Sequence, residues 1–427
     1  MDIDGWEQAI VEASRQAMAN ALQTVVTAQE ALDACPACGA DAVGWHDNRS
    51  RVVLTSFGRV VLRVGRAACR VCGHRCRPAQ EALASLGGGN TTAALRTAAV
   101  AAGSSWPFAT AARLLGELLG ATISPEQVRH LTIATGQQVA PDQQATATAL
   151  VAPSADAIRA ERTAATERTR HGSRPVTAAP TPARLLVGLD DGWVPSREQA
   201  GGMEGKVGVV ATGVVAISST RQALIPRRYV ATFAPARVLG TLTYVAADAL
   251  GGTQSPCQIV VGDGAEWIKH QAAQHFPTAT CILDWTHLAR VILRAVRLAC
   301  PGSGQRDRRW ILYRSLTDHL WSGAVDAAAE VLAGLRDPAT VCPALAEAVG
   351  YLASQRDWLG DYAAWQAAGY PIGSGMIERA VALVINWRMK DRGMRWTRTS
   401  ASAIVALRVE RLNHDWDDDM SGLELAA

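Results

Sequence analysis

The chain has 427 residues, of which 48% are hydrophobic, and a formal net charge of +3. A chain of this length is expected to hold two or three domains with at least one large core. No apolar run reaches the ~20 residues of a membrane-spanning helix, and the acidic N-terminus lacks the apolar segment of a secretion signal. We therefore expect a soluble cytoplasmic protein with no membrane partner.

The N-terminal segment, residues 1–33, has apolar residues at helical spacing that predict a helix over residues 5–32. Two CxxC motifs follow within residues 34–80. Between the motifs, two valine-rich runs flank a glycine turn, which predicts a β-hairpin. Two such motifs on a hairpin are typical of a zinc ribbon, in which four thiolates complete a closed, structural Zn²⁺ site. His74 and Cys76 are alternative ligands. The predicted ligands are Cys35, Cys38, Cys69 and Cys72.

Residues 81–140 are predicted to form a small helical module. Ser124 and Pro125 are a favourable helix start, and the short connection before them resembles the turn of a helix-turn-helix. The helix after that turn would place Arg129 in the major groove of DNA, although a plain helical bundle is the alternative. The helices are expected over residues 92–102, 108–119 and 125–139.

A linker rich in Ala, Thr and Pro is predicted over residues 141–182, and strands follow it. Three strands, a helix and a fourth strand fit the order of an RNase H-like catalytic core, so we expect an α/β multidomain protein with the first part of this core at residues 183–290. The strands are expected over 183–191, 206–217, 223–233 and 257–262, the helix over 235–249, and a further strand over 280–283.

The remaining chain is predicted to be mainly helical. Residues 291–366 are interpreted as a helical insertion, because they far exceed what the catalytic core needs. Residues 367–412 would complete the core, and residues 413–427 would form an acidic tail. Helices of the insertion are expected over 307–320, 323–335 and 343–367.

Acidic residues follow two predicted buried strands and occupy a later predicted helix. Asp191 follows LLVGL, Asp263 follows QIVVG, and Glu378 lies in GSGMIE. Two aspartates on neighbouring strands with a glutamate on a helix are what a two-metal phosphoryl-transfer site requires. We therefore expect these three residues to bind Mg²⁺ or Mn²⁺. Asp190 competes for the first position, because only one of two adjacent strand residues can face the site.

Several residues near these acids could contact DNA. His287 follows a predicted strand and could position DNA beside the site, or it could simply pack while Asp284 caps its helix. The basic residues could line a groove for the phosphate backbone, or lie on a solvated helix face. Trp396 could stack on an unpaired base, although burial is the commoner role of tryptophan. The candidates are Arg290, Arg294, Arg388, Lys390, Arg392, Arg395 and Trp396.

Four segments resemble the DDE transposases of bacterial insertion sequences, most closely the ISKra-type family. They are VLTSFGRVVLRVGRAACRVCG, GLDDGW, VVGDGAEWI with LDWTHLARVI, and YPIGSGMIERAVALVINWRMKDRGMRW. The resemblance implies catalytic acids at Asp191, Asp263 and Glu378, with Asp191 favoured over Asp190 because Asp-Gly at the strand end fits the family pattern.

The same resemblance implies an enzyme that binds terminal inverted repeats and cuts and joins DNA strands in the presence of Mg²⁺. Two ends must be paired with target DNA, so at least a homodimer is expected. An RNase H-like nuclease and a non-enzymatic DNA-binding protein derived from a transposase are the alternatives.

Overall fold

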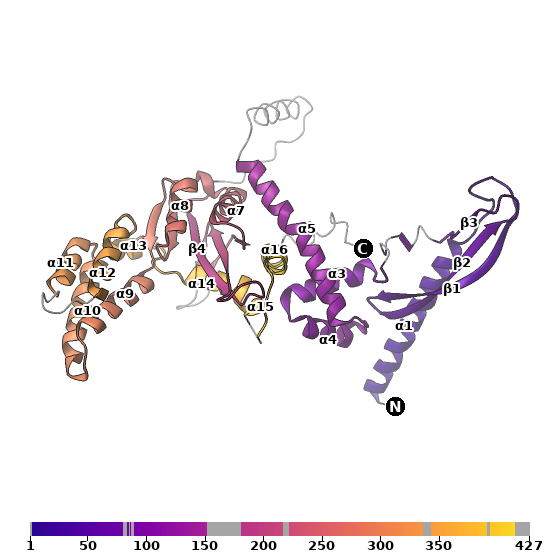
Figure 1. Ribbon diagram of the computed structural model, residues 1–427, viewed down its shortest axis with the longest axis horizontal. Helices are drawn as coiled ribbons and strands as arrows, with labels where there is room; N and C mark the ends of the chain where they lie inside the picture. The colour runs from indigo at the N-terminus through magenta and orange to yellow at the C-terminus, as the bar shows by residue number, and fades with distance from the viewer. Residues whose placement is uncertain are drawn as a thin grey trace, which may run out of the picture. The chain divides into compact units, whose positions relative to one another are not determined.

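The computed structural model describes residues 2–79, 83–84, 86, 89–151, 181–216, 222–335, 343–390 and 393–414 (Figure 1). The chain folds into two compact units, one built from residues up to Val139 and the other starting at Ala140. No helix in this described part is long and apolar enough to cross a membrane.

The first unit begins with a helix and a long β-hairpin. Helix α1 (Ile3–Ala28) starts at the N-cap Asp2, whose carboxylate accepts the N–H of Gly5. Strands β1 (Val43–Thr55) and β2 (Gly58–Cys69) are antiparallel, and β3 (Arg75–Cys76) pairs with β2. Buried side chains of the hairpin pack against α1, so the helix and hairpin predicted from the sequence are confirmed and share one small core.

Three helices follow: α3 (Ala93–Ser105), α4 (Phe108–Leu119) and α5 (Pro125–Val151), of which α5 belongs to the first unit only up to Val139. Helix α4 ends at Gly120, which has a left-handed φ of 68°. Ser124 and Gln127 then form a reciprocal cap, because the Ser124 hydroxyl accepts the Gln127 N–H and the Gln127 amide oxygen accepts the Ser124 N–H, both at 3.1 Å.

Helix α5 corrects the predicted linker. The helix was expected to end at Val139, and the linker to start at Pro141, but α5 continues through Pro141 to Val151. Proline costs a helix one N–H bond without always ending it, and the residues that follow are good helix formers. The rest of the predicted linker, residues 152–180, lies outside the described residues.

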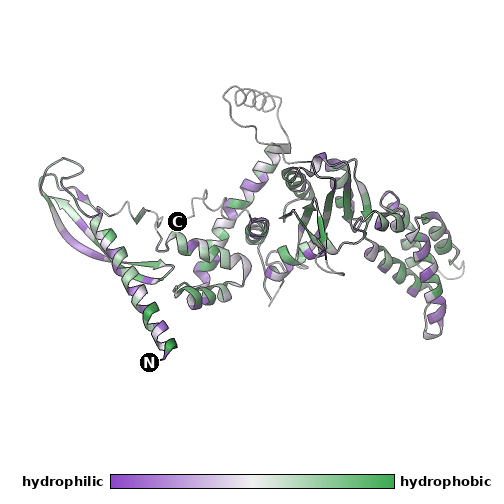
Figure 2. Ribbon diagram, turned by 180° about the vertical axis from the view of Figure 1, so that it is seen from behind, coloured by the Kyte–Doolittle hydropathy of each residue, from purple (hydrophilic) through white to green (hydrophobic). Residues whose placement is uncertain are grey.

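The second unit is built on a mixed five-stranded sheet with the order β10-β9-β4-β5-β8. Strand β5 is antiparallel to both of its neighbours, whereas β9 and β10 run parallel to β4. Hydrophobic residues concentrate on this sheet and the helices around it (Figure 2). The strands are β4 (Leu185–Val194), β5 (Met203–Ala211), β8 (Arg227–Thr232), β9 (Gln258–Gly262) and β10 (Thr280–Leu283).

Two predicted strands are each broken in the structure. The strand expected over residues 206–217 divides into β5 and β6 (Val214–Ala216), and the one expected over 223–233 divides into β7 (Gln222–Leu224) and β8. The break falls at Gly213, where a β-carbon would lie 2.3 Å from the Ile225 carbonyl oxygen. Among the described residues, β6 and β7 form a two-stranded sheet of their own, separate from the five-stranded sheet.

Helices cover both faces of the sheet. A β-carbon at Gly208 of β5 would meet Thr243 of α7 (Ala236–Ala249), so α7 lies on one face. Helix α8 (Glu266–His275) packs beside α7. Helix α14 (Gly375–Val381) lies on the other face, and a π-helical turn (Ala382–Asn386), α15 (Trp387–Met389) and α16 (Arg398–Asn413) follow it.

A group of helices lies between β10 and α14 in the chain, where the sequence predicted mainly helical structure, and the boundary expected at residue 291 falls inside its first helix. It comprises α9 (Trp285–Ala299), α10 (Arg306–Trp321), α11 (Val325–Gly334), α12 (Pro343–Ser354) and α13 (Tyr362–Ala367). The single helix expected over residues 343–367 is wrong, because a 3₁₀ turn (Arg356–Trp358) separates α12 from α13 and Asp361 caps a new helix start. The predicted acidic tail from residue 415 onward lies outside the described residues.

Candidate metal site and carboxylate cluster

The four cysteines of the two CxxC motifs converge on one point. Their Sγ atoms all lie within 4.8 Å of one another. Cys35 and Cys72 are 3.7 Å apart, and Cys38 and Cys69 are 3.6 Å apart. Four thiolates at this spacing could hold a structural metal ion such as zinc. The structure therefore confirms that the four predicted ligands lie together.

The two cysteine turns have the same backbone design. Gly39 and Gly73 follow the second cysteine of each motif, with positive φ of 73° and 72°. Their N–H groups donate back to the carbonyls of Cys35 and Cys69, at 2.9 and 3.0 Å. The glycine after each CxxC is a signal in the sequence that adds to the motif, because this left-handed backbone favours glycine.

Backbone N–H groups also favour a thiolate in this cluster. The N–H groups of Cys72 and Val71 lower the pKa of Cys69 to about 6. Cys76, by contrast, lies outside the group of four, and burial raises its pKa. His74 is exposed and is not a member of the cluster either. The structure thus favours the four CxxC cysteines over both alternatives.

A second candidate site lies in the five-stranded sheet, where the parallel strands β9 and β10 end beside β4. Strands β4 and β9 pair in parallel with Gly188 opposite Val261. The same register, continued by two residues, places Asp190 beside Asp263. Strand β10 pairs Leu283 with Gly262, and Asp284 follows directly, with its N–H on the Gly262 carbonyl at 2.8 Å. Three neighbouring parallel strands therefore bring acidic residues to the same edge.

Alternation along β4 decides which aspartate faces Glu378. β-Carbons added at Gly188 and Gly192 would each lie 3.0 Å from side chains of α14, namely Ile377 and Val381. Asp190 falls between these glycines, so it shares their face, and α14 also carries Glu378. Asp191 points to the opposite face, where Lys206 is its partner across the strand pair.

The electrostatics agree with this geometry. Burial raises the pKa of Asp190 to about 7, and the negative charges of Asp263, Asp191 and Glu378 add to the shift. Burial also raises the pKa of Asp191, and the charges of Glu204 and Asp263 add to the shift, while Lys206 and Lys390 oppose it; Glu378, which acts on Asp190, is not among these charges. The structure therefore groups Asp190, rather than the Asp191 expected from the sequence, with Asp263 and Glu378.

The carboxylates are less tightly gathered than the thiolates. Within the described ranges, the cysteine cluster is the only group of three or more Cys, His, Asp or Glu residues whose potential ligand atoms all lie within 4.8 Å. The carboxylates of Asp190, Asp263 and Glu378 share a face, and their mutual repulsion opposes closer approach until cations neutralise it.

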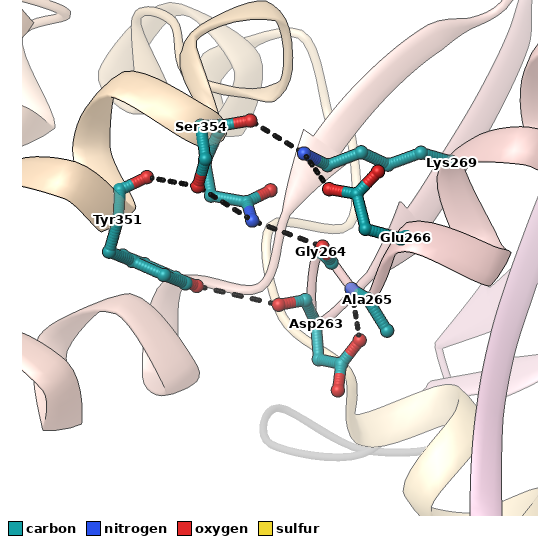
Figure 3. Close-up of polar contacts among 8 residues, drawn as sticks. Asp263, Gly264, Ala265, Glu266, Lys269, Tyr351 and Ser354 are labelled. Atoms are coloured by element: carbon teal, nitrogen blue, oxygen red, sulfur yellow. Dashed lines mark hydrogen bonds and ion pairs between the residues drawn. The ribbon is translucent and has the colours of Figure 1, made fainter. Parts of the chain in front are cut away.

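The inserted helices hold the loop that carries Asp263 (Figure 3). One carboxylate oxygen of Asp263 accepts the N–H of Ala265 at 2.9 Å, which fixes the turn. The Tyr351 hydroxyl of α12 donates to the Asp263 carbonyl at 3.4 Å, and the Gln355 amide donates to the Gly264 carbonyl at 3.0 Å. Sequence reasoning missed Tyr351 and Gln355, because contacts across 88 and 91 residues leave no local pattern.

Ser374 links Glu378 to the end of β10. Its hydroxyl oxygen lies 2.8 Å from Asp284 Oδ2 and 2.9 Å from Glu378 Oε1. Asp284 also accepts the N–H groups of Thr286, His287 and Ser374, so its predicted role as the cap of α9 is confirmed. Since Asp284 is buried and surrounded by donors, it serves as a fixed anchor for Ser374.

The side chain of His287, on α9, lies beside Tyr351 of α12. It is half-buried, and its ring centroid is 6.2 Å from that of Tyr351. Because Tyr351 contacts the Asp263 carbonyl, His287 is one residue removed from the carboxylate loop. The cap at Asp284 is confirmed, and a role of His287 in positioning DNA stays a prediction.

The candidate DNA-contacting residues divide by exposure. Arg290, Arg294, Lys390 and Arg395 are exposed, and Arg129 is exposed with its guanidinium 2.5 Å from Glu126. Arg392 lies outside the described residues. These exposed side chains remain candidates for contact with a phosphate backbone.

Two of the candidates are buried instead. Arg388 is 1% exposed, and burial, with the nearby charge of Arg408, lowers its pKa to about 9. Its guanidinium lies 5.0 Å from the ring centroid of Trp396, which is 6% exposed and donates to the Met389 carbonyl at 3.0 Å. Both residues therefore lie in the core: Arg388 is not on the DNA-facing surface for which it was a candidate, and Trp396 has the buried role that was the commoner alternative to stacking.

Comparison with models of known protein families found no match, and comparison with curated proteins found none either. The observed class is an α/β protein with a mixed five-stranded sheet and a four-cysteine cluster that could hold a metal ion.

Proposed function

We propose that the chain is a DNA transposase of the DDE type and that its second unit is an RNase H-like catalytic core. The observation that carries the proposal is the grouping of Asp190, Asp263 and Glu378 on one face of the sheet. The strand order β10-β9-β4-β5-β8, with β5 alone antiparallel, supports the assignment of the core. The sequence resemblance supports the choice of DNA as substrate.

The three carboxylates fit the hard cations that such a reaction uses. Their oxygen atoms suit Mg²⁺ or Mn²⁺, which when bound would lower the pKa of a water molecule and stabilise the leaving oxygen. Asp190 and Asp263 would hold the cations from the carboxyl ends of the strands, and Glu378 would complete the cation site from α14. Tyr351 and Gln355 would keep the Asp263 loop in place.

The reaction would proceed in two displacements at phosphorus. In the first, water attacks the phosphate at the element end, the bond to the 3′ oxygen breaks, and this oxygen takes up a proton to become a 3′-hydroxyl. In the second, that hydroxyl loses its proton and attacks a target phosphate, the bond from this phosphate to another 3′ oxygen breaks, and the displaced oxygen takes up a proton to become a 3′-hydroxyl. No covalent enzyme intermediate is needed, because positioning and electrostatics supply the catalysis.

Other parts of the chain would bind DNA. The cysteine cluster with its hairpin, and the module of α3, α4 and α5, would recognise terminal inverted repeats. Exposed Arg290 and Arg294 on α9, with Lys390 and Arg395, would contact the phosphate backbone. A homodimer or larger assembly would pair the two ends.

The proposal is tested with the full chain and DNA that carries the sequences flanking its reading frame. We expect nicks at the two ends, followed by joining to a second duplex, in Mg²⁺ or Mn²⁺ and not in EDTA. Gel electrophoresis of end-labelled strands measures both steps. Cleavage of RNA–DNA hybrids without any strand joining would favour the nuclease, and binding without cleavage would favour the non-enzymatic protein.

Ser374→Ala is expected to weaken metal binding at the proposed site. The hydroxyl that contacts Glu378 and Asp284 would be lost, so the Glu378 carboxylate would no longer be held toward the sheet edge. Loss of such a supporting hydrogen bond costs about 10- to 100-fold in metal affinity or activity. The measurement is the Mn²⁺ concentration that gives half-maximal strand cleavage.

A matched control is Ser322→Ala, which removes an exposed hydroxyl that donates to the Asp318 carbonyl at 3.1 Å and, within the described residues, has no contact with the Asp263 loop or Glu378. This control should leave the Mn²⁺ requirement unchanged. A Ser374→Ala enzyme that is slower at every Mn²⁺ concentration, with the same half-maximal value, would show that Ser374 does not position a metal ligand.

A further inference from the structure

A pocket of about 820 Å³ opens beside the end of β4, within the second unit. Its walls are the last residues of β4, the loop over residues 195–202, and two residues between α15 and α16. This volume falls in the range of small-molecule sites. The side chains that give the pocket its chemistry are Trp193, Arg197, Gln199, Lys390 and Arg395.

The walls of the pocket are held by the backbone. The Arg197 N–H donates to the Trp396 carbonyl at 2.8 Å, and the Trp396 N–H donates to the Pro195 carbonyl at 3.0 Å. Gly202 has a φ of 90°, and a β-carbon there would lie 2.7 Å from the Val194 carbonyl oxygen and 3.8 Å from the Trp193 ring. The loop therefore approaches the indole at a position that only glycine fits.

The pocket combines an aromatic face with positive charge. Trp193 is 53% exposed, although a tryptophan at the end of a core strand is usually covered. Arg197, Lys390 and Arg395 are all exposed, and within the described residues none of the three takes part in an ion pair. The acid in the lining is Glu198, whose carboxylate accepts the Arg398 N–H at 3.0 Å.

The pocket is also close to the carboxylates. Trp193 follows Asp190 by three residues on one strand, about 10 Å at ~3.3 Å per residue. The positive charge of Lys390 acts on Asp191, where it lowers the pKa against the upward shift caused by burial. Alternation places the Trp193 side chain on the face of β4 that carries Asp191, so a DNA strand whose phosphate lay at Asp190 would extend a neighbouring nucleotide past the end of β4 to reach the pocket.

We propose that this pocket binds an unpaired nucleotide next to the phosphate that is cut, with its base stacked on Trp193 and its phosphates near Lys390 and Arg395. The inference rests on the proposed function, since it needs a DNA strand at the carboxylates. Stacking on an aromatic side chain tolerates any base, and the cations supply a contact that is equally independent of sequence.

The test uses the full chain in EDTA and a single strand of thymidines that carries one 2-aminopurine, whose fluorescence falls when it stacks on an indole. The wild type should quench the probe. Trp193→Ala should abolish the quenching and weaken binding roughly 5- to 100-fold, whereas Trp193→Phe should keep most of the affinity. The control Trp310→Ala removes an indole that is 59% exposed on α10, outside this pocket, and should change nothing.

Lys390→Gln with Arg395→Gln provides a second measurement. Each lost phosphate contact should reduce the slope of log K against log salt by about 0.7 for a single strand. Undiminished quenching by Trp193→Ala would overturn the proposal, and so would an equal loss of affinity for a fully paired duplex. Because EDTA prevents cleavage, the result is independent of catalysis. If the chain cuts no DNA while Trp193→Ala still abolishes quenching, the proposed function fails and the nucleotide site stands.

Discussion

Asp190→Asn is expected to abolish strand cleavage, whereas Asp191→Asn should retain most of it. Asp190 lies beside Asp263 and on the face that carries Glu378, while Asp191 faces Lys206 on the other side of the sheet. Loss of a carboxylate that binds the catalytic cations removes several kcal/mol of transition-state stabilisation, or about a thousandfold in rate or more. The same loss is expected for Asp263→Asn and Glu378→Gln.

The two adjacent aspartates make a matched pair, because each substitution is isosteric and removes one charge. Cleavage is measured on end-labelled DNA in Mg²⁺ and in Mn²⁺, and duplex binding is measured in EDTA to show that the variants still fold and bind. Full activity of Asp190→Asn together with loss in Asp191→Asn would return the first position to Asp191, as the family resemblance implied. Activity in both variants would remove the carboxylate site from the proposal.

Protonation of Asp190 should make the stability of the folded chain depend on pH. Its folded-state pKa of about 7 lies above the ordinary value of 3.8, so the folded chain binds the proton more tightly than the unfolded chain. Without metal, this carboxylate should therefore lower stability as the pH rises from about 4 to about 7, on the order of 2–4 kcal/mol in total. Asp190→Asn should remove that loss, and cation affinity in the wild type should rise through the same range.

The sequence predicted which segments form the strands of the sheet better than it predicted which side chains face the site or lie in the core. Apolar runs that end in a carboxylate identified β4 and β9, because buried parallel strands leave a strong local pattern. The choice between Asp190 and Asp191 needed the face of the sheet on which α14 packs, and contacts across nearly 190 residues decide that. The burial of Arg388 could not be predicted either, because a helix with basic residues has the same sequence pattern whether those residues face solvent or pack against a core.

Local chemistry explains which parts of the site could be predicted. The cysteine cluster follows from two short motifs and a hairpin, and each motif carries its own turn geometry. Ser374, Tyr351 and Gln355 support the carboxylates from distant segments, so they have no such signature. The glycines of β4, Gly188 and Gly192, were a signal in principle, because they leave room for a helix to approach the strand closely.

Cys72→Ser is expected to remove the metal from the first unit and unfold its hairpin module. Four thiolates within 4.8 Å form a closed site, and loss of one ligand leaves three that repel one another when ionised. The core that α1 shares with the hairpin is small, so metal binding would supply much of its folding free energy, on the order of 10 kcal/mol for structural zinc. The measurements are bound zinc per chain and proteolysis within residues 34–79.

The matched control is Cys76→Ser, because Cys76 lies next to the cluster but outside the group of four. It should keep one zinc ion per chain and resist proteolysis like the wild type. Chelation of zinc should reproduce the effect of Cys72→Ser and weaken binding to duplex DNA that carries the terminal repeats. The carboxylate face of the sheet contains none of these cysteines, so the sheet unit should keep its own unfolding transition. One full equivalent of zinc in Cys72→Ser would contradict a four-cysteine site, and zinc lost only in Cys76→Ser would transfer the ligand role to that residue.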